Sequence, residues 1–120
     1  MMKSKKPCKQ RKAFYQAPLH KKHKFLAAHL SKELRMQMKK RSLPVRKGDE
    51  VKVMRGKFKG ITGKISKIDL KRLKVYIENV KRKKVSGEEV HVPIHPSKLL
   101  LINPNMDDQR RKEAIERNKK

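Results

Sequence analysis

The sequence predicts a small, mainly β domain with a basic N-terminal extension that contains short helices and with a short C-terminal helix. Between residues 44 and 103, apolar side chains alternate with polar ones over short stretches separated by turn residues, which indicates a small barrel or sandwich. Residues 1–47 instead carry 16 Lys or Arg and one acid, Glu33. The 120 residues suffice for one domain, which we divide into 1–20, 21–43, 44–103 and 104–120.

Residues 1–20 form a basic arm that we expect to be extended. They have few apolar side chains and no clear periodicity, so they bury too little surface to offset the entropy of ordering. The arm should be disordered alone and extended when bound. Phe14 and Tyr15 interrupt its basic run. They either stack on the bases of a nucleic acid or fix the arm onto the domain, and both alternatives remain open.

Two short helices are expected in residues 21–43. In the first, Phe25, Leu26 and Leu30 lie near one side with lysines opposite, which is the pattern of an amphipathic helix. Ser31 then precedes a second helical stretch, where its hydroxyl can accept from the exposed amides of the first turn. Leu30, Leu34 and Met38 recur at a spacing of four, which makes one apolar stripe.

Strands are expected from Pro44 onward, because the apolar period changes to two. Val51 and Val53 alternate with polar neighbours, as do the apolar residues of the later stretches. Ile68 falls out of step with Ile65, which indicates a β-bulge or a bend near Ser66–Lys67. The barrel or sandwich therefore contains at least one irregular strand.

Turns and strand ends in this region are marked by particular residues. Asp69–Arg72 and Ser86–Gly87 are expected hairpin tips. Pro93 lacks the N–H that a central strand donates, so its strand should lie at an edge or end early. The run LLLI at residues 99–102 predicts a closing strand that is covered on both faces.

The tail at residues 104–120 is expected to form a short helix. Asp107 or Asp108 can cap its first turn. Ala114 and Ile115 are its only apolar residues after Met106, so it should not hold itself down. A frayed, solvated helix and a docked one both remain open.

The formal charge of +25 limits the classes of partner. So much self-repulsion works against a compact state, which favours a polyanionic partner, and nucleic acid gains most from counterion release. An anionic membrane surface and a solvated basic tail are the alternatives. No apolar run approaches the roughly 20 residues of a spanning helix, and no secretory signal is visible, so we expect no membrane insertion and a place inside the cell.

Catalytic and metal chemistry are not indicated. Cys8 is the single cysteine. An internal disulfide needs two cysteines, and no second cysteine is present to form a zinc site with Cys8. Asp49–Glu50 and Glu88–Glu89 flank turns, where capping and solubility explain them. No phosphate-binding glycine loop that opens a helix and no metal-ligand spacing occurs. We expect no catalytic residues, no metal, no cofactor and no small-molecule substrate.

The most informative segment is VRKGDEVKVMRGKFKGITGKISKIDLK, residues 45–71, which indicates a strand, a glycine-bracketed loop and a second strand. Gly48 supplies a turn, Gly56 and Gly60 bracket the loop, and Gly63 lets a neighbouring backbone approach closely. The loop should project three cations outward from a rigid base as a phosphate clamp.

Three expected contact zones for a nucleic acid follow from these cations. The loop zone comprises Arg55, Lys57 and Lys59, with Lys64 beside it. The arm zone comprises Arg11, Lys12, Tyr15, Lys21, Lys22, Lys24, Arg35, Arg46 and Lys47. The far-end zone comprises Lys81 to Lys84, of which Lys83 is the central candidate, with His95 and Lys98.

The segment 45–71 resembles the KOW motif, which is found in ribosomal proteins and in transcription elongation factors and which implies an SH3-like barrel. The flanks KAFYQAPLHKKHKFLAAHLSKELR and VPIHPSKLLL resemble the archaeal and eukaryotic form of large-subunit ribosomal protein L twenty-four. This resemblance extends from about Arg11 to Arg117.

That family resemblance implies a structural constituent of the large subunit in the cytoplasmic ribosome, bound to the 5′ region of large-subunit ribosomal RNA (rRNA). It also implies neighbouring large-subunit proteins, a role in subunit assembly and a position near the polypeptide exit tunnel. The alternatives are a KOW-type transcription elongation protein, although that family adds a polymerase-binding domain for which there is no room here, and a nonspecific nucleic-acid-binding protein.

Overall fold

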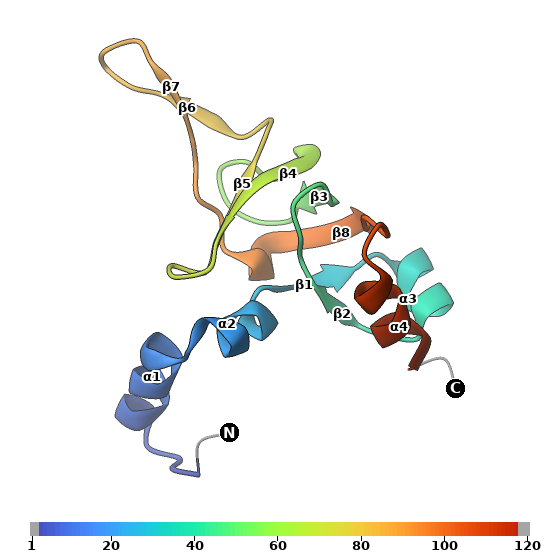
Figure 1. The fold of residues 1–120 in the computed structure, drawn as a ribbon. Coiled ribbons are helices and arrows are strands. Elements are labelled where there is room, and N and C mark those ends of the chain that lie inside the picture. Colours follow the sequence, from blue (N-terminus) through green and yellow to red (C-terminus); the bar gives the residue numbers. More distant parts are fainter. Residues whose placement is uncertain (1–2, 118–120) are drawn as a thin grey trace.

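The fold is mixed helix and strand, built around one six-stranded sheet (Figure 1). The computed structural model describes residues 3–117. Across the sheet, the strands are β2 (Ser42–Pro44), β1 (Ala27–Leu30), β8 (Leu99–Asn103), β3 (Glu50–Val53), β4 (Thr62–Asp69) and β5 (Lys74–Ile77). The helices are α1 (Pro7–Gln16), α2 (Leu19–Phe25), α3 (Lys32–Met38), η1 (Pro96–Lys98, a 3-10 turn) and α4 (Gln109–Arg117). The six-stranded sheet is consistent with the expected small, mainly β domain, although helices form a larger share of the described chain than that expectation implied.

The strand pairing does not give the closed barrel that the sequence suggested. β3, β4 and β5 form an antiparallel meander, and β8 pairs antiparallel with β3 and parallel with β1. Within the described residues β2 and β5 are the edges of the sheet, and β5 makes only one further bridge, between Val75 and Ile94. Pro93 explains the short pairing, because a proline next to Ile94 has no N–H to extend the ladder.

Residues 27–30 form β1, where a helix had been expected. Leu26, Ala28 and Leu30 are buried while His29 is exposed, so the apolar period is two. Leu26 and Leu30 also fit a helical spacing of four, which made the two patterns hard to separate. Pairing with β8 decides between them, because the Ser31 N–H donates to the Leu101 carbonyl at 3.1 Å. The second expected helix is present as α3, and the Ser31 hydroxyl accepts from the Leu34 N–H as predicted.

The N-terminal arm is helical, where an extended chain had been expected. α1 begins at Pro7, a residue favoured in the first helical turn, and continues through Lys, Gln, Arg and Ala, which are good helix formers. None of its residues is buried. Figure 1 shows α1 and α2 extending from the sheet to the end of the molecule opposite the β6–β7 hairpin described below. The outer ends of the predicted arm and tail, residues 1–2 and 118–120, lie outside the described residues.

The predicted turns and irregularities in the β region are confirmed. The register of β4 against β5 shifts between Ile65 and Lys67, where the bulge was expected. β6 (Lys81–Lys83) and β7 (Glu89–His91) form a separate hairpin whose tip contains Gly87, and it projects from the body in Figure 1. β7 ends before Pro93, as predicted.

The core lies between the sheet and the segments that cover it. β8 supplies Leu99 and Leu101, which are fully buried, although Leu100 and Ile102 are only half-buried. The other buried apolar residues are Leu26, Ala28, Leu30, Met38, Leu43, Val45, Val51, Val53, Ile65, Leu73, Val75, Ile77, Val80, Ile94 and Ile115. Because Ile115 belongs to α4, the C-terminal helix is docked and not frayed.

Candidate nucleic-acid interface

The loop between β3 and β4 is built as the sequence predicted. Gly56 and Gly60 have φ of +95° and +91°, angles that disfavour other residues, and Gly60 N–H donates to the Val53 carbonyl at 2.8 Å. Phe58 packs against the core, whereas the cations before and after it are exposed. The loop therefore has an apolar anchor and presents Arg55, Lys57 and Lys59 to solvent.

The other two glycines in the motif differ from each other. Gly48 has φ of +91° and occupies a turn, as expected. Gly63 lies within strand β4 and not in a turn, and what approaches it is side chains rather than a backbone. A Cβ at this position would stand 2.9 Å from Ile77 Cγ2 and 3.0 Å from Asn79 Nδ2. Gly63 thus permits β5 and the following turn to pack closely on β4.

Arg55 connects the loop to the segment around η1. Its Nη2 donates to the Ser97 carbonyl at 3.2 Å, and the Met54 N–H donates to the Lys98 carbonyl at 2.7 Å. His95 and Lys98 therefore lie with the loop zone. Lys83, which the sequence grouped with them, stands on the projecting β6–β7 hairpin. The structure thus places His95 and Lys98 of the predicted far-end zone next to the loop zone, and it leaves Lys83 apart from both on the hairpin.

His95 is held as a neutral side chain. Burial, then the nearby charges of Lys74, Lys98 and Arg55, lowers the pKa of His95 below 6.5. Its Nδ1 accepts from the Ser97 N–H at 3.1 Å and lies 2.8 Å from Ser97 Oγ. The ring proton is therefore assigned to Nε2, so His95 offers a hydrogen-bond donor without a charge.

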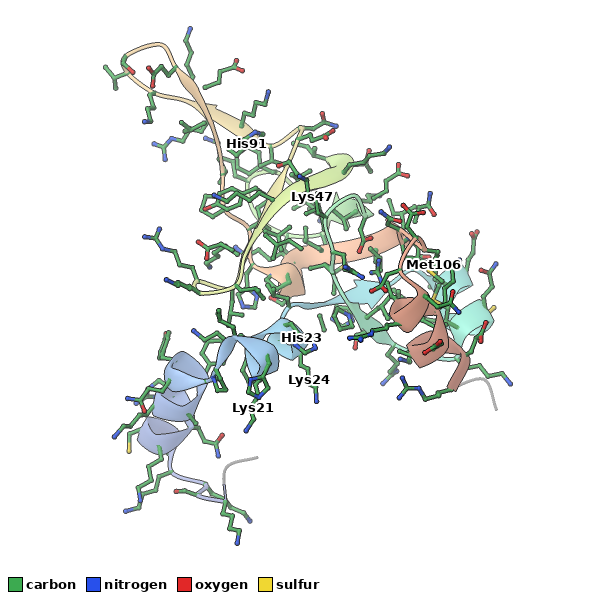
Figure 2. The ribbon with its side chains drawn as sticks, in the orientation of Figure 1. Lys21, His23, Lys24, Lys47, His91 and Met106 are labelled. Carbon is green, nitrogen blue, oxygen red and sulfur yellow. The ribbon has the colours of Figure 1, made fainter. Side chains whose placement is uncertain are left out.

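The arm residues separate into exposed and buried ones. Lys21 and Lys24 are exposed and directed away from the sheet in Figure 2, whereas Lys22 is only 8% exposed. Lys22 Nζ donates to the Lys71 carbonyl at 3.1 Å, which attaches α2 to the β4–β5 turn. Three of the residues predicted for the arm zone, Arg11, Lys12 and Tyr15, lie on α1, and all three are exposed. In the free protein, Lys22 therefore has a structural contact that the sequence did not indicate.

Four further predicted residues divide into two with side-chain contacts inside the described part of the protein and two without. Arg35 is half-buried, and its Nε donates to the Leu30 carbonyl at 3.0 Å. Arg46 forms an ion pair with Asp108. Lys47, labelled in Figure 2, and Lys64 on β4 are exposed. Arg35 and Arg46 thus also serve the fold, while Lys47 and Lys64 remain open to a partner.

A buried ion pair between Asp49, just before β3, and Arg111 of α4 was missed by the sequence reasoning. Asp49, interpreted there as a turn residue, is fully buried, and both its oxygens accept from Arg111, with N–O distances of 2.7 and 2.6 Å. Asp49 also accepts from the N–H groups of Arg46 and Asn105 at 2.9 and 2.8 Å. The interpretation as a cap was therefore only part of its role. Because the two side chains are 62 positions apart, no local pattern signalled the pair.

Positive charge dominates the surface of the described chain. Its structure contains two ion pairs, Arg46–Asp108 and Asp49–Arg111, so most of the cations have no internal counterion. In residues 3–117, His, Cys, Asp and Glu form no group of three that could hold a metal. None of the helices described in that range is long and apolar enough to cross a membrane. The arrangement suits a phosphate-rich partner.

Comparison with known proteins identifies the family. Residues 4–118 match the family model of ribosomal proteins L26 (eukaryotic) and L twenty-four P (archaeal). A relative in Methanosphaera stadtmanae, the large ribosomal subunit protein uL24, is 46% identical over 114 residues, which are 95% of this chain and 97% of that protein. The resemblance noted in the sequence is thereby confirmed, and so is the expectation of a protein that is not an enzyme. The chain belongs to the family of eukaryotic L26 and archaeal L twenty-four P ribosomal proteins, which are structural components of the cytoplasmic ribosome.

Proposed function

We propose that this protein is a constituent of the large ribosomal subunit that binds large-subunit rRNA. The observation that carries the proposal is the rigid β3–β4 loop, in which an anchored Phe58 sits between the exposed cations Arg55, Lys57 and Lys59. The name of the Methanosphaera stadtmanae relative supports the choice of subunit. A preorganised cluster of this kind neutralises phosphates without first ordering a flexible loop.

Recognition should depend on the shape of the RNA backbone. The major groove of an RNA helix is deep and narrow, so side chains reach phosphates and looped bases more readily than paired ones. Arg55 Nη2 donates hydrogen bonds to Ser97, which fixes the orientation of the guanidinium and leaves its other N–H donors free for a phosphate. Lys57, Lys59 and Lys98 act as point charges around it.

The finer assignment comes from the family resemblance. It comprises the 5′ region of the rRNA, support of subunit assembly, a site near the polypeptide exit tunnel and contacts with neighbouring large-subunit proteins. An SH3-like arrangement of β3, β4, β5 and β8 belongs to the same proposal. The long basic N-terminal segment and the projecting β6–β7 hairpin support it, because both offer exposed cations beyond the sheet.

The loop is tested with the triple variant Arg55→Ala, Lys57→Ala and Lys59→Ala. Binding to a 5′ fragment of large-subunit rRNA should weaken, and the slope of log affinity against log salt should flatten by about one unit per lost phosphate contact. The control removes the same charge from α4, by Arg110→Ala, Lys112→Ala and Arg117→Ala. If the slope of log affinity against log salt were the same for the two triple variants, the loop would make no more phosphate contacts than α4, and it would not belong to the interface.

The cellular assignment is tested by gradient sedimentation of a lysate with detection of this chain. Co-migration with large subunits is expected. Co-migration with RNA polymerase would instead favour a transcription factor, and a spread over all nucleic acid would favour a nonspecific binder.

A further inference from the structure

A cavity of about 460 Å³ lies between the N-terminal helices and one end of the sheet. Phe14 and Tyr15 of α1 and Lys22 of α2 form one side, and the turn between β4 and β5 forms another. His95, just before η1, completes the lining. Figure 1 shows the β4–β5 turn lying next to α2, so the cavity is assembled from segments far apart in the sequence. Its size is that of a small-ligand site.

The turn that contributes Lys71 and Arg72, and after which Lys74 begins β5, is held in a fixed shape. Lys22 Nζ donates to the Lys71 carbonyl, and Asp69 Oδ1 accepts from the Arg72 N–H at 3.2 Å. Leu73 has φ of +56°, a left-handed conformation that a branched side chain rarely adopts, and it is buried. A residue held in such a conformation by its surroundings often belongs to a binding site.

The lining combines aromatic, cationic and neutral-donor groups. Tyr15 is 72% exposed, and its ring stands edge-to-face with Phe14, 5.4 Å between centroids; Phe14 in turn packs on Phe25. Lys71, Arg72 and Lys74 supply positive charge, and none of the described residues that line the cavity is acidic. His95 is neutral and carries its proton on Nε2, for which the described residues provide no acceptor.

We propose that this cavity holds one nucleotide unstacked from the RNA, with its base against Tyr15 and its phosphates on Lys71, Arg72 and Lys74. This rests on the proposed function of RNA binding and adds a defined site to it. A base offers a flat π-face that can stack on an aromatic ring. Its flanking phosphates offer anionic groups that the cations Lys71, Arg72 and Lys74 can bind. Cations alone would suit any phosphate, but the exposed Tyr15 beside them selects an unpaired nucleotide over a duplex.

The test compares full-length protein binding to a fully paired RNA hairpin and to its counterparts that carry a single bulged A, C, G or U. At least one bulged hairpin should bind more tightly than the paired one. Tyr15→Ala should reduce that preference by about tenfold, the usual effect of losing one base–aromatic stack. Arg72→Gln should reduce it as well. Both side chains are exposed, so neither substitution should disturb the fold.

Two controls separate the cavity from general RNA binding. Met36→Ala removes another exposed apolar side chain, on α3, and should leave the preference unchanged. Lys57→Gln, in the loop, should weaken binding to paired and bulged hairpins equally. The proposal is overturned if no bulged hairpin is preferred, or if the preference survives both Tyr15→Ala and Arg72→Gln. Tight, salt-dependent binding to all hairpins alike would overturn it while leaving the proposed function intact.

Discussion

The C-terminal helix α4 and the N-terminal helix α1 are both short and rich in charge, yet the fold attaches them differently. α4 buries Arg111 and Ile115, four positions apart on one side, against the body of the protein. α1 buries no residue, and its neighbour α2 is held through Lys22. α4 thus has an internal carboxylate, Asp49, as the partner of its buried Arg111. The cations of α1 are exposed and remain available to an external anionic partner.

The difference follows from the carboxylates nearby. Asp49 lies in the core beneath α4, prearranged by the N–H groups of Arg46 and Asn105. Lys22 instead meets a neutral acceptor, the Lys71 carbonyl. A carboxylate neutralises a buried cation fully, whereas a carbonyl leaves its positive charge in place. The N-terminal side should therefore be both less stable and more attractive to phosphate.

The largest expected effect comes from breaking the Asp49–Arg111 pair. Arg111→Ala leaves Asp49 buried without its counterion, which should lower the free energy of unfolding by about 3–5 kcal/mol. Urea denaturation measures it. Arg110→Ala, next to it but exposed, is the control and should change stability by less than about 0.5 kcal/mol. If both variants were equally stable, α4 would be as loosely attached as α1 and the comparison would fail.

Local signals in the sequence predicted much of the fold. The cap at Ser31, the bulge after Ile65, the end of β7 before Pro93 and the Gly56–Gly60 loop all depend on a few neighbouring residues. Where a distant partner decided, prediction failed. β1 is a strand because β8 lies beside it, and the Leu26–Leu30 spacing alone could not reveal that. The open sheet likewise depends on how little β5 pairs with the segment around Ile94.

The candidate site shows the same limit. Charge identified exposed candidates such as Arg55 and Lys57 correctly as surface residues, but it could not separate Lys22 or Arg111, which are buried, from the other cations. Lys71 and Arg72 were interpreted only as turn residues, because their meeting with Tyr15 requires α1 and α2 to fold back toward the β4–β5 turn.

A smaller effect should distinguish the N-terminal side. Lys22→Met keeps the buried aliphatic length but removes the amine that donates to the Lys71 carbonyl. We expect a loss of about 1 kcal/mol in the free energy of unfolding. Amide hydrogen exchange should become faster in α2 and leave α4 unchanged, since the contact is local. Lys21→Met, on the exposed side of α2, is the matched control. Faster exchange in both helices would mean that the two ends are coupled.

The smallest expected effect is a pH dependence that arises from His95, which lines the cavity beside the N-terminal helices. The pKa of His95 is lowered by burial and by Lys74, Lys98 and Arg55, so the folded state resists its protonation. The stability that this group contributes is fully present above its unfolded value of 6.5 and is lost as the pH falls toward the lower folded value. Unfolding in urea at about pH 7.5 and about pH 5.5 measures the loss.

The variant His95→Asn removes this titration while an Asn can still accept from the Ser97 N–H at the start of η1. Its stability should therefore fall less on acidification than that of the unaltered protein, and hydrogen exchange around the cavity should respond more than exchange in α4. His23→Asn introduces the same side chain at an exposed position of α2, and it is the matched control that should leave hydrogen exchange around the cavity unchanged. If His95→Asn and the unaltered protein lost equal stability on acidification, the acid response would not come from His95, and the cavity would then make no pH-dependent contribution to the fold.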